Sequence, residues 1–194
     1  MDSEDFGLVA PVPGQTEVIE TGKPQYGRLV LQQPFVYPDG AERVYFFFGN
    51  KRTPAVALAV TRDNQVIMTY QYRHAAMQFG YEVPGGCPKG DEDGEAVVRA
   101  ELLEETGFEA GELVELPSLF QDPASWRVTM QLFLALNCRK IAEPKLDPTE
   151  NLVTALIPLE EWLGMIMSGQ VHDAKTISIT MLALPYLGMQ IVGS

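Results

Sequence analysis

The stretch "AELLEETGF" (residues 100–108) decides the fold, because it places three glutamates where a helix is expected to end. Gly107 marks that end, since glycine adopts the left-handed backbone conformation of a helix terminus without steric cost. Glu101, Glu104 and Glu105 therefore crowd the negative end of the helix dipole, where each exposed carboxylate costs about 0.3–1 kcal/mol. A merely solvated surface would more cheaply carry Lys or Gln. The cluster therefore indicates a bound cation.

The helical spacing brings these carboxylates onto one side. At about 100° per residue, Glu101 and Glu105 lie about 40° apart, and Glu104 lies about 60° to the other side. Oxygen ligands on a rigid element suit Mg²⁺ or Mn²⁺. Glu92, in the acidic loop just upstream, extends the cluster. The glycine pair at 85–86 indicates a backbone group that approaches something closely.

Length and composition favour one soluble globular domain with an added arm: 194 residues, 46% hydrophobic and 21% charged. The net charge of −12 argues against nucleic acid as a partner. It leaves anionic small ligands open, because a bound divalent metal reverses the local sign. Two cysteines make no disulfide framework, the acidic start is no secretory signal, and the apolar stretch 177–192 is too short to span a membrane. A cytoplasmic protein is expected.

The pattern of the chain predicts a mixed α/β fold with a mixed sheet between helices. Residues 1–25 are expected to form a loose acidic tail and residues 26–49 a β arm with a turn at "YPDG"; the main domain covers residues 50–194. Further strands are expected at 55–60, 66–73, 126–136 and 151–158, and helices at 159–169 and 173–187.

The segment "GCPKGDEDGEAVVRAELLEETGF" (residues 86–108) resembles the Nudix box, G-x5-E-x7-R-E-U-x-E-E-x-G-U. Ala100 stands where the box has arginine, and Arg99 lies one residue early. In the family that arginine orients the acidic residues, so either Arg99 reaches round or the orientation is looser here. The matching positions are Gly86, Glu92, Glu101, Leu102, Glu104, Glu105, Gly107 and Phe108.

The flanking residues resemble the branch of ADP-ribose and nucleoside diphosphate sugar pyrophosphatases. Gln71-Tyr72-Arg73 matches its Q-[YF]-R element, and residues 82–86 match E-x-P-[GA]-G. Pro123 falls where this branch carries a proline, although the context "DPASW" departs from its usual Ser-Pro-Gly. The resemblance implies a Nudix-type α/β/α sandwich with a mixed sheet, and an N-terminal arm that builds a homodimer and part of the substrate pocket.

The implied activity is Mg²⁺-dependent (or Mn²⁺-dependent) hydrolysis of the diphosphate bond of a nucleoside diphosphate sugar, with ADP-ribose first, giving AMP and ribose 5-phosphate. GDP-mannose, ADP-glucose and UDP-glucose are alternatives, followed by dinucleoside polyphosphates and coenzyme A. A Nudix protein that binds a nucleotide sugar without hydrolysing it is a further alternative, which the presence of all four box glutamates disfavours.

The resemblance also implies roles for single residues. The metal ligands are Glu101, Glu105 and Glu104 with the Gly85 carbonyl, and Glu92 acts through water. Glu150, on a late loop, is the expected general base, with Asp147 as its substitute; Glu101 and Glu104 are the box alternatives.

Four residues are substrate-binding candidates, and three of them also have a structural alternative. Arg73 suits a phosphate, because its planar guanidinium binds two oxygens, or it forms a surface ion pair. Glu82 contacts substrate or is a charge at a sheet edge. Pro123 lies at the proline position of the branch, and Trp126 is a candidate to stack on a base, as are the aromatics at 45–48, although aromatics at strand spacing are more often core.

Overall fold

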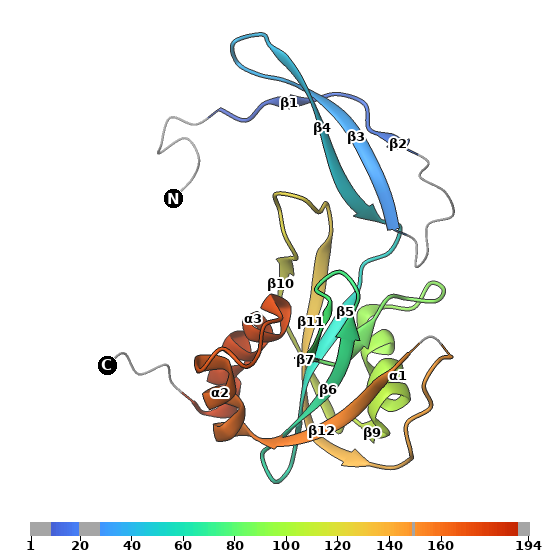
Figure 1. Cartoon of the computed structure of the whole chain (residues 1–194), viewed down its shortest axis with the longest axis vertical. Coiled ribbons are helices and arrows are strands. Elements are labelled where there is room, and N and C mark those ends of the chain that lie inside the picture. Colours follow the sequence, from blue (N-terminus) through green and yellow to red (C-terminus); the bar gives the residue numbers. More distant parts are fainter. Residues whose placement is uncertain (1–8, 20–27, 149, 190–194) are drawn as a thin grey trace. The chain divides into compact units, whose positions relative to one another are not determined.

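The computed structural model describes residues 9–19, 28–148 and 150–189 (Figure 1). The chain divides into two compact units. The first consists of Met1–Arg52 with Phe120–Val128, and the second of Thr53–Leu119 with Thr129–Ser194. The segment Phe120–Val128, which carries two candidate site residues, groups with the N-terminal residues in the first unit.

The second unit is built on a mixed sheet. Its strand order is β10-β11-β5-β6-β12, with β7 beside β6, β8 beside β5 and β9 beside β11. β5 runs parallel to β11 and antiparallel to β6, and β12 runs antiparallel to β6. The strands are β5 Ala55–Thr61, β6 Gln65–Arg73, β7 Gln78–Glu82, β8 Gly85–Gly86, β9 Phe108–Glu109, β10 Glu112–Phe120, β11 Thr129–Lys140 and β12 Leu152–Pro158.

One face of this sheet is covered by α2 (Leu159–Met167) and α3 (Ala174–Ala183). Residues of a strand alternate between faces, and Val56 and Leu58 of β5 share a buried cluster with Trp162 of α2 and Ile179 of α3. The expected C-terminal helix at 173–187 is divided, because α3 is followed by a short 3-10 helix, Leu184–Leu187, that contains Pro185.

The other face is covered by α1 (Gly94–Thr106). Here β5 presents the small side chains Ala55, Ala57 and Ala59, which pack with Val98 and Leu102 of the helix. Small side chains let a helix approach a strand closely, so the alanines of β5 determine the distance between β5 and α1. Figure 1 shows α1 on one side of the sheet and α2 with α3 on the other, which confirms the α/β/α sandwich.

α1 begins and ends at residues suited to these positions. Asp93 caps its start, where the side chain accepts a hydrogen bond from the Ala96 amide at 2.8 Å. Gly107 ends it with φ 76°, and a Cβ there would lie 2.1 Å from the Ala142 carbonyl oxygen. The helix therefore ends at the glycine that the sequence indicates.

The first unit contains a β hairpin of β3 (Arg28–Val36) and β4 (Glu42–Asn50), as expected for the arm. The expectation of a loose tail is wrong for part of its length, because β1 (Val12–Pro13) and β2 (Glu17–Ile19) pair with β3. These residues satisfy the edge of β3 opposite β4, which would otherwise present unpaired backbone groups. The remaining tail residues, 1–8 and 20–25, lie outside the described residues.

The segment Phe120–Val128 is tied to β4 rather than forming the start of a strand. The Phe48 amide donates to the Ser125 carbonyl and the Arg127 amide to the Phe48 carbonyl, each at 2.7 Å. The strand expected at 126–136 therefore begins at Thr129, after this segment. Across the described residues, no helix has the length and apolarity that crossing a membrane requires.

Candidate active site

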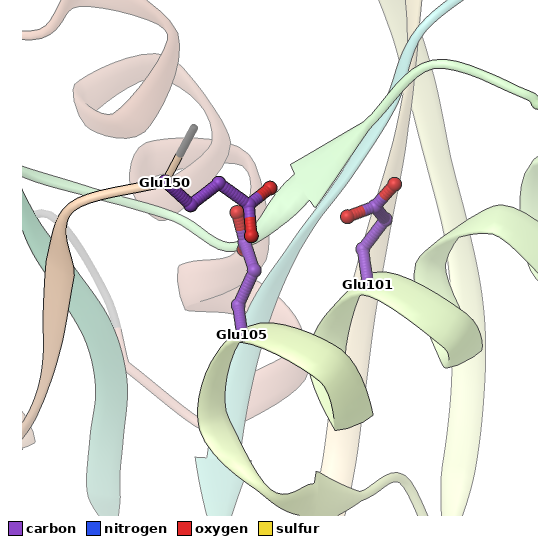
Figure 2. A group of neighbouring side chains, drawn as sticks. All are labelled: Glu101, Glu105 and Glu150. Carbon is purple, nitrogen blue, oxygen red and sulfur yellow. The ribbon is translucent and has the colours of Figure 1, made fainter. Parts of the chain in front are cut away.

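Two carboxylates of α1 and one from the chain before β12 form a compact group. Glu101 and Glu105 lie one helical turn apart and are buried, with 9% and 6% of their surfaces exposed. Glu150 reaches them from the loop, and a carboxylate oxygen from each residue lies within 4.8 Å of the other two. Figure 2 shows Glu101 and Glu105 rising from α1 and Glu150 extending across from its loop. Carboxylate oxygens so placed are the donors that a hard divalent cation prefers.

The glycine pair that forms β8 makes this arrangement possible. The Gly85 amide donates to Glu105 Oε2 at 3.1 Å. A Cβ on Gly85 would lie 2.5 Å from the Ala55 carbonyl oxygen, and a Cβ on Gly86 would lie 2.4 Å from Glu101 Oε1. Backbone and carboxylates thus approach to a distance that only glycine allows. The Gly85 carbonyl, an expected ligand, belongs to this same strand.

Burial makes both buried carboxyls hold protons more tightly. It raises the pKa of Glu105 to about 8, and the charges of Glu101 and Glu150 add to this, while the Gly85 amide and Arg73 oppose it. Burial likewise raises the pKa of Glu101 to about 7, with Lys89 opposing the shift. A neighbouring cation would remove this penalty. The raised pKa values and the grouping of carboxylate oxygens therefore both indicate that the site is suited to a cation.

Glu104 stands apart from the group. Its carboxylate accepts a hydrogen bond from Lys89 Nζ at 2.7 Å, on the flank of α1 that the helical spacing separates from Glu105. Glu92 is exposed in the acidic loop and accepts a hydrogen bond from the Gly90 amide at 2.5 Å. The expected ligand set is thus divided: Glu101 and Glu105 are brought together with Glu150, whereas Glu104 pairs with a lysine.

The loop that carries Glu150 is closed by two hydrogen bonds. The Asp147 amide donates to Glu150 Oε2 at 2.8 Å, and the Glu150 amide donates to the Asp147 carbonyl at 2.9 Å. Glu150 therefore lies beside the box carboxylates, and its side chain also stabilises the turn. Asp147, the expected substitute, is its neighbour in that turn.

Arg99 does not reach round to the box glutamates. Its guanidinium donates to Glu95 at 2.9 Å and to the Ala110 carbonyl at 3.2 Å. The first of the two alternatives for the missing box arginine, that Arg99 reaches round to the acidic residues, is therefore wrong. Gly85 and burial hold Glu105 instead.

Two substrate-binding candidates bind each other. Arg73 Nε donates to Glu82 Oε1 at 2.5 Å and Nη2 to Oε2 at 2.7 Å. Glu82 is buried, whereas half of the Arg73 side chain is exposed. Sequence reasoning missed their third partner, Lys175, whose Nζ lies 2.5 Å from Glu82 Oε2. The sequence "DAK" at the start of α3 indicates a helix cap at Asp173 but carries no signal that Lys175 binds Glu82.

Pro123 and Trp126 belong to the first unit. Pro123 is exposed, and the Trp126 ring packs on Phe48 with 5.0 Å between centroids. The aromatics of β4, expected more often in a core, are largely exposed: 44% of Tyr45, 63% of Phe46 and 45% of Phe48.

The fold, an α/β/α sandwich, therefore brings together three carboxylates whose chemistry suits a hard divalent cation. Residues 51–177 match the NUDIX domain. The chain belongs to the Nudix family, as its box indicated, and is a Nudix hydrolase.

Several known proteins are similar to it. It is 33% identical to an ADP-ribose pyrophosphatase of Bacillus subtilis (strain 168) over 128 residues, 65% of this chain and 69% of the relative. It is 30% identical to a GDP-mannose pyrophosphatase of Citrobacter koseri over 142 residues, 69% of this chain and 72% of the relative. A solved structure described as an ADP compounds hydrolase shares the fold, with a TM-score of 0.78 at 20% identity over 93% of this chain and 96% of that one.

Proposed function

We propose that the protein hydrolyses the diphosphate bond of a nucleoside diphosphate sugar, with ADP-ribose as its preferred substrate and AMP and ribose 5-phosphate as products. The observation that carries this proposal is the group of Glu101, Glu105 and Glu150 around the Gly85–Gly86 strand. Three converging carboxylates repel a diphosphate unless a cation lies between them.

Mg²⁺ or Mn²⁺ suits these donors, and a divalent cation there would offset the charge of the diphosphate, polarise a phosphoryl oxygen and lower the pKa of a water. The residues divide the remaining work. Glu101 and Glu105 hold the cation, with the Gly85 carbonyl as a further ligand. Glu150 takes the proton of the attacking water, because a loop carboxylate is better placed for this than one engaged at the cation. Arg73 binds a phosphate with N–H donors that Glu82 does not use.

The choice of ADP-ribose rests on the similarity to an ADP-ribose pyrophosphatase at 33% identity. GDP-mannose is the second candidate, because relatives named GDP-mannose pyrophosphatase reach 30% identity. Purified protein with Mg²⁺ and a panel of ADP-ribose, GDP-mannose, ADP-glucose and UDP-glucose tests the choice. The highest kcat/KM is expected for ADP-ribose, with AMP and ribose 5-phosphate separated as products; a higher value for GDP-mannose would reassign the substrate.

The hydrolytic role is distinguished from mere binding by Glu105→Gln. This variant keeps the shape of the side chain and removes a ligand, so kcat should fall at least about 10²-fold. A wild-type protein that binds ADP-ribose with Mg²⁺ but releases no product would instead be a nucleotide-sugar sensor.

We also propose that the arm makes a homodimer and that Pro123 and Trp126 contribute to substrate binding with it. The exposed aromatics of β4 support the first point, and the packing of Trp126 on Phe48 supports the second. The protein is proposed to act in the cytoplasm, where the thiols of Cys87 and Cys138 would stay reduced.

A further inference from the structure

A buried network of charges connects the start of α3 to Arg73. Lys175 Nζ lies 2.5 Å from Glu82 Oε2 and 2.8 Å from Asp173 Oδ2. Glu82 in turn holds Arg73 through both of its carboxylate oxygens. Glu82 and Lys175 are largely buried, with 4% and 18% of their side chains exposed, whereas Arg73 opens to solvent. The exposed end of the network is thus the Arg73 guanidinium.

The charges of the network balance only when Lys175 is present. Arg73 and Lys175 supply two positive charges, and Glu82 and Asp173 supply two negative ones. Burial disfavours the ionised form of Glu82, but the hydrogen bonds from Arg73 and the nearby charge of Lys175 outweigh it, and its pKa is lowered. Glu82 is therefore ionised, and its negative charge lies against the Arg73 guanidinium that is proposed to bind a phosphate.

That charge has opposite effects on Arg73. The bidentate contact fixes the plane of the guanidinium, yet Glu82 also cancels its positive field toward an approaching anion. Lys175 contacts Oε2 of Glu82, where it compensates this charge and restrains the carboxylate in the orientation that binds Arg73. Without Lys175, the network would carry a net negative charge beside the substrate.

Hydrogen bonds connect the backbone around the network. Asp173 caps α3 by accepting from the Thr176 amide at 3.0 Å, and Thr176 Oγ1 accepts a hydrogen bond from the Val83 amide at 3.0 Å. The helix start is thus tied to the chain just before Gly85. Lys175 therefore lies in a helix turn that is hydrogen-bonded to the chain that follows β7.

We infer that Lys175 is a positioning residue for substrate binding, which acts through Glu82 to hold Arg73 and to keep its positive charge effective toward a diphosphate. This inference rests on the proposed function. Its consequence is a particular kinetic signature. Loss of Lys175 weakens binding of the anionic substrate and leaves the cation group and the chemical step largely unaffected.

The test compares Lys175→Met, Lys175→Gln and Lys175→Arg, with ADP-ribose and Mg²⁺ as the probe. Lys175→Met is expected to raise KM at least about 10-fold while kcat stays within about threefold. Lys175→Gln keeps a donor without the charge and should behave like Lys175→Met, and it decides the matter if the Met variant does not fold. Lys175→Arg should restore KM to within about threefold of wild type. The control is Lys140→Met, which removes an exposed lysine paired with Glu143 and should change neither constant.

A second readout needs no substrate. A guanidinium held by a carboxylate exchanges its Nε proton slowly, so the Arg73 Nε–H signal in an NMR spectrum reports its bond to Glu82. The signal should be present in wild type and Lys175→Arg and be broadened in Lys175→Met and Lys175→Gln. An unchanged signal, or an unchanged KM in folded variants, overturns the inference. Absence of any turnover by wild type would overturn the proposed function instead, and the NMR comparison would still decide the role of Lys175.

Discussion

Glu105 shows how one residue connects stability to cation binding. It is buried at the end of α1, and its pKa of about 8, with that of Glu101 at about 7, lies above the ordinary value of 4.5. Without a cation, the folded protein therefore binds more protons than the unfolded chain between about pH 4.5 and pH 8. This stabilisation is fully present below about pH 4.5 and is lost as the pH rises through the folded-state values.

The prediction concerns metal-free protein. Its melting temperature should fall as the pH rises from about 5 to about 8, and Glu105→Gln should flatten this slope, because glutamine does not titrate. Saturating Mg²⁺ should flatten it as well, since a cation replaces the protons. Thermal unfolding in chelator, across this pH range, is the measurement. A wild-type slope that rises with pH would show that these carboxyls are ionised in the metal-free fold.

Glu150 and Glu104 separate two assignments of the general base. Glu150 lies with the buried carboxylates, whereas Glu104 is paired with Lys89. General-base catalysis contributes about 10²–10⁴-fold, so Glu150→Gln should lower kcat by about that factor with little change in Mg²⁺ binding. Glu104→Gln should cost far less. If Glu150→Gln keeps more than about a third of kcat and Glu104→Gln abolishes it, the base is in the box.

At the scale of elements, β8 is the strand whose backbone lies against the carboxylates of Glu101 and Glu105. Gly86→Ala would place a Cβ 2.4 Å from Glu101 Oε1, at the far end of a flexible side chain, whereas Gly85→Ala would meet the backbone of Ala55. Gly86→Ala should therefore fold, displace Glu101 and weaken Mg²⁺ binding about 10-fold or more. Gly85→Ala should lower stability itself. Titration calorimetry with Mg²⁺, alongside unfolding curves, measures both effects.

Gly80→Ala on β7 is the matched control, because a Cβ there meets nothing within 4 Å. It should leave Mg²⁺ affinity and stability close to those of wild type. Gly86→Ala with unchanged Mg²⁺ affinity would mean that Glu101 is not held against β8 when the cation binds.

Local signals explain which elements were predictable from sequence. α1, with its cap and its terminal Gly107, and the strongly apolar β5 could be identified because each carries its own pattern. β10 was missed, because "ELVELPSLF" mixes glutamates and a proline into a strand whose pairing with β11 is non-local. β1 and β2 were taken for tail, because strands of two and three residues have no periodicity to detect.

The residues of the site also separate into those that a local sequence pattern indicates and those that depend on the fold. Glu101 and Glu105 follow from helical spacing, and the place of Glu150 came from resemblance alone. The sequence could not show that Glu104 pairs with Lys89 or that Arg73 pairs with Glu82. Each pairing depends on which charged groups the fold brings close together. Lys175 lies 93 positions from Glu82, and no local pattern connects them.

At the scale of the whole molecule, the first unit presents more apolar surface than an isolated sheet can sustain. Its described strands form one four-stranded sheet, and Val12, Val18, Tyr45 and Phe46 remain between 44% and 66% exposed. A small sheet with this much exposed apolar surface is marginal in water, and exposed apolar patches mark interaction surfaces. A second copy of the chain is the partner that we expect, because symmetric homodimers are the commonest soluble assemblies.

The protein should therefore be a dimer at micromolar concentration, as measured by light scattering coupled to size-exclusion chromatography. Phe46→Asp places a charge at the most exposed aromatic of β4 and should shift the population toward monomer. Val153→Asp is the control, since Val153 is 62% exposed on β12 of the second unit and lies outside the arm. It should leave the dimer intact. A monomeric wild type at this concentration would rule out the dimer. A Phe46→Asp variant as dimeric as wild type would mean that the two copies meet through a surface other than the exposed aromatics of β4.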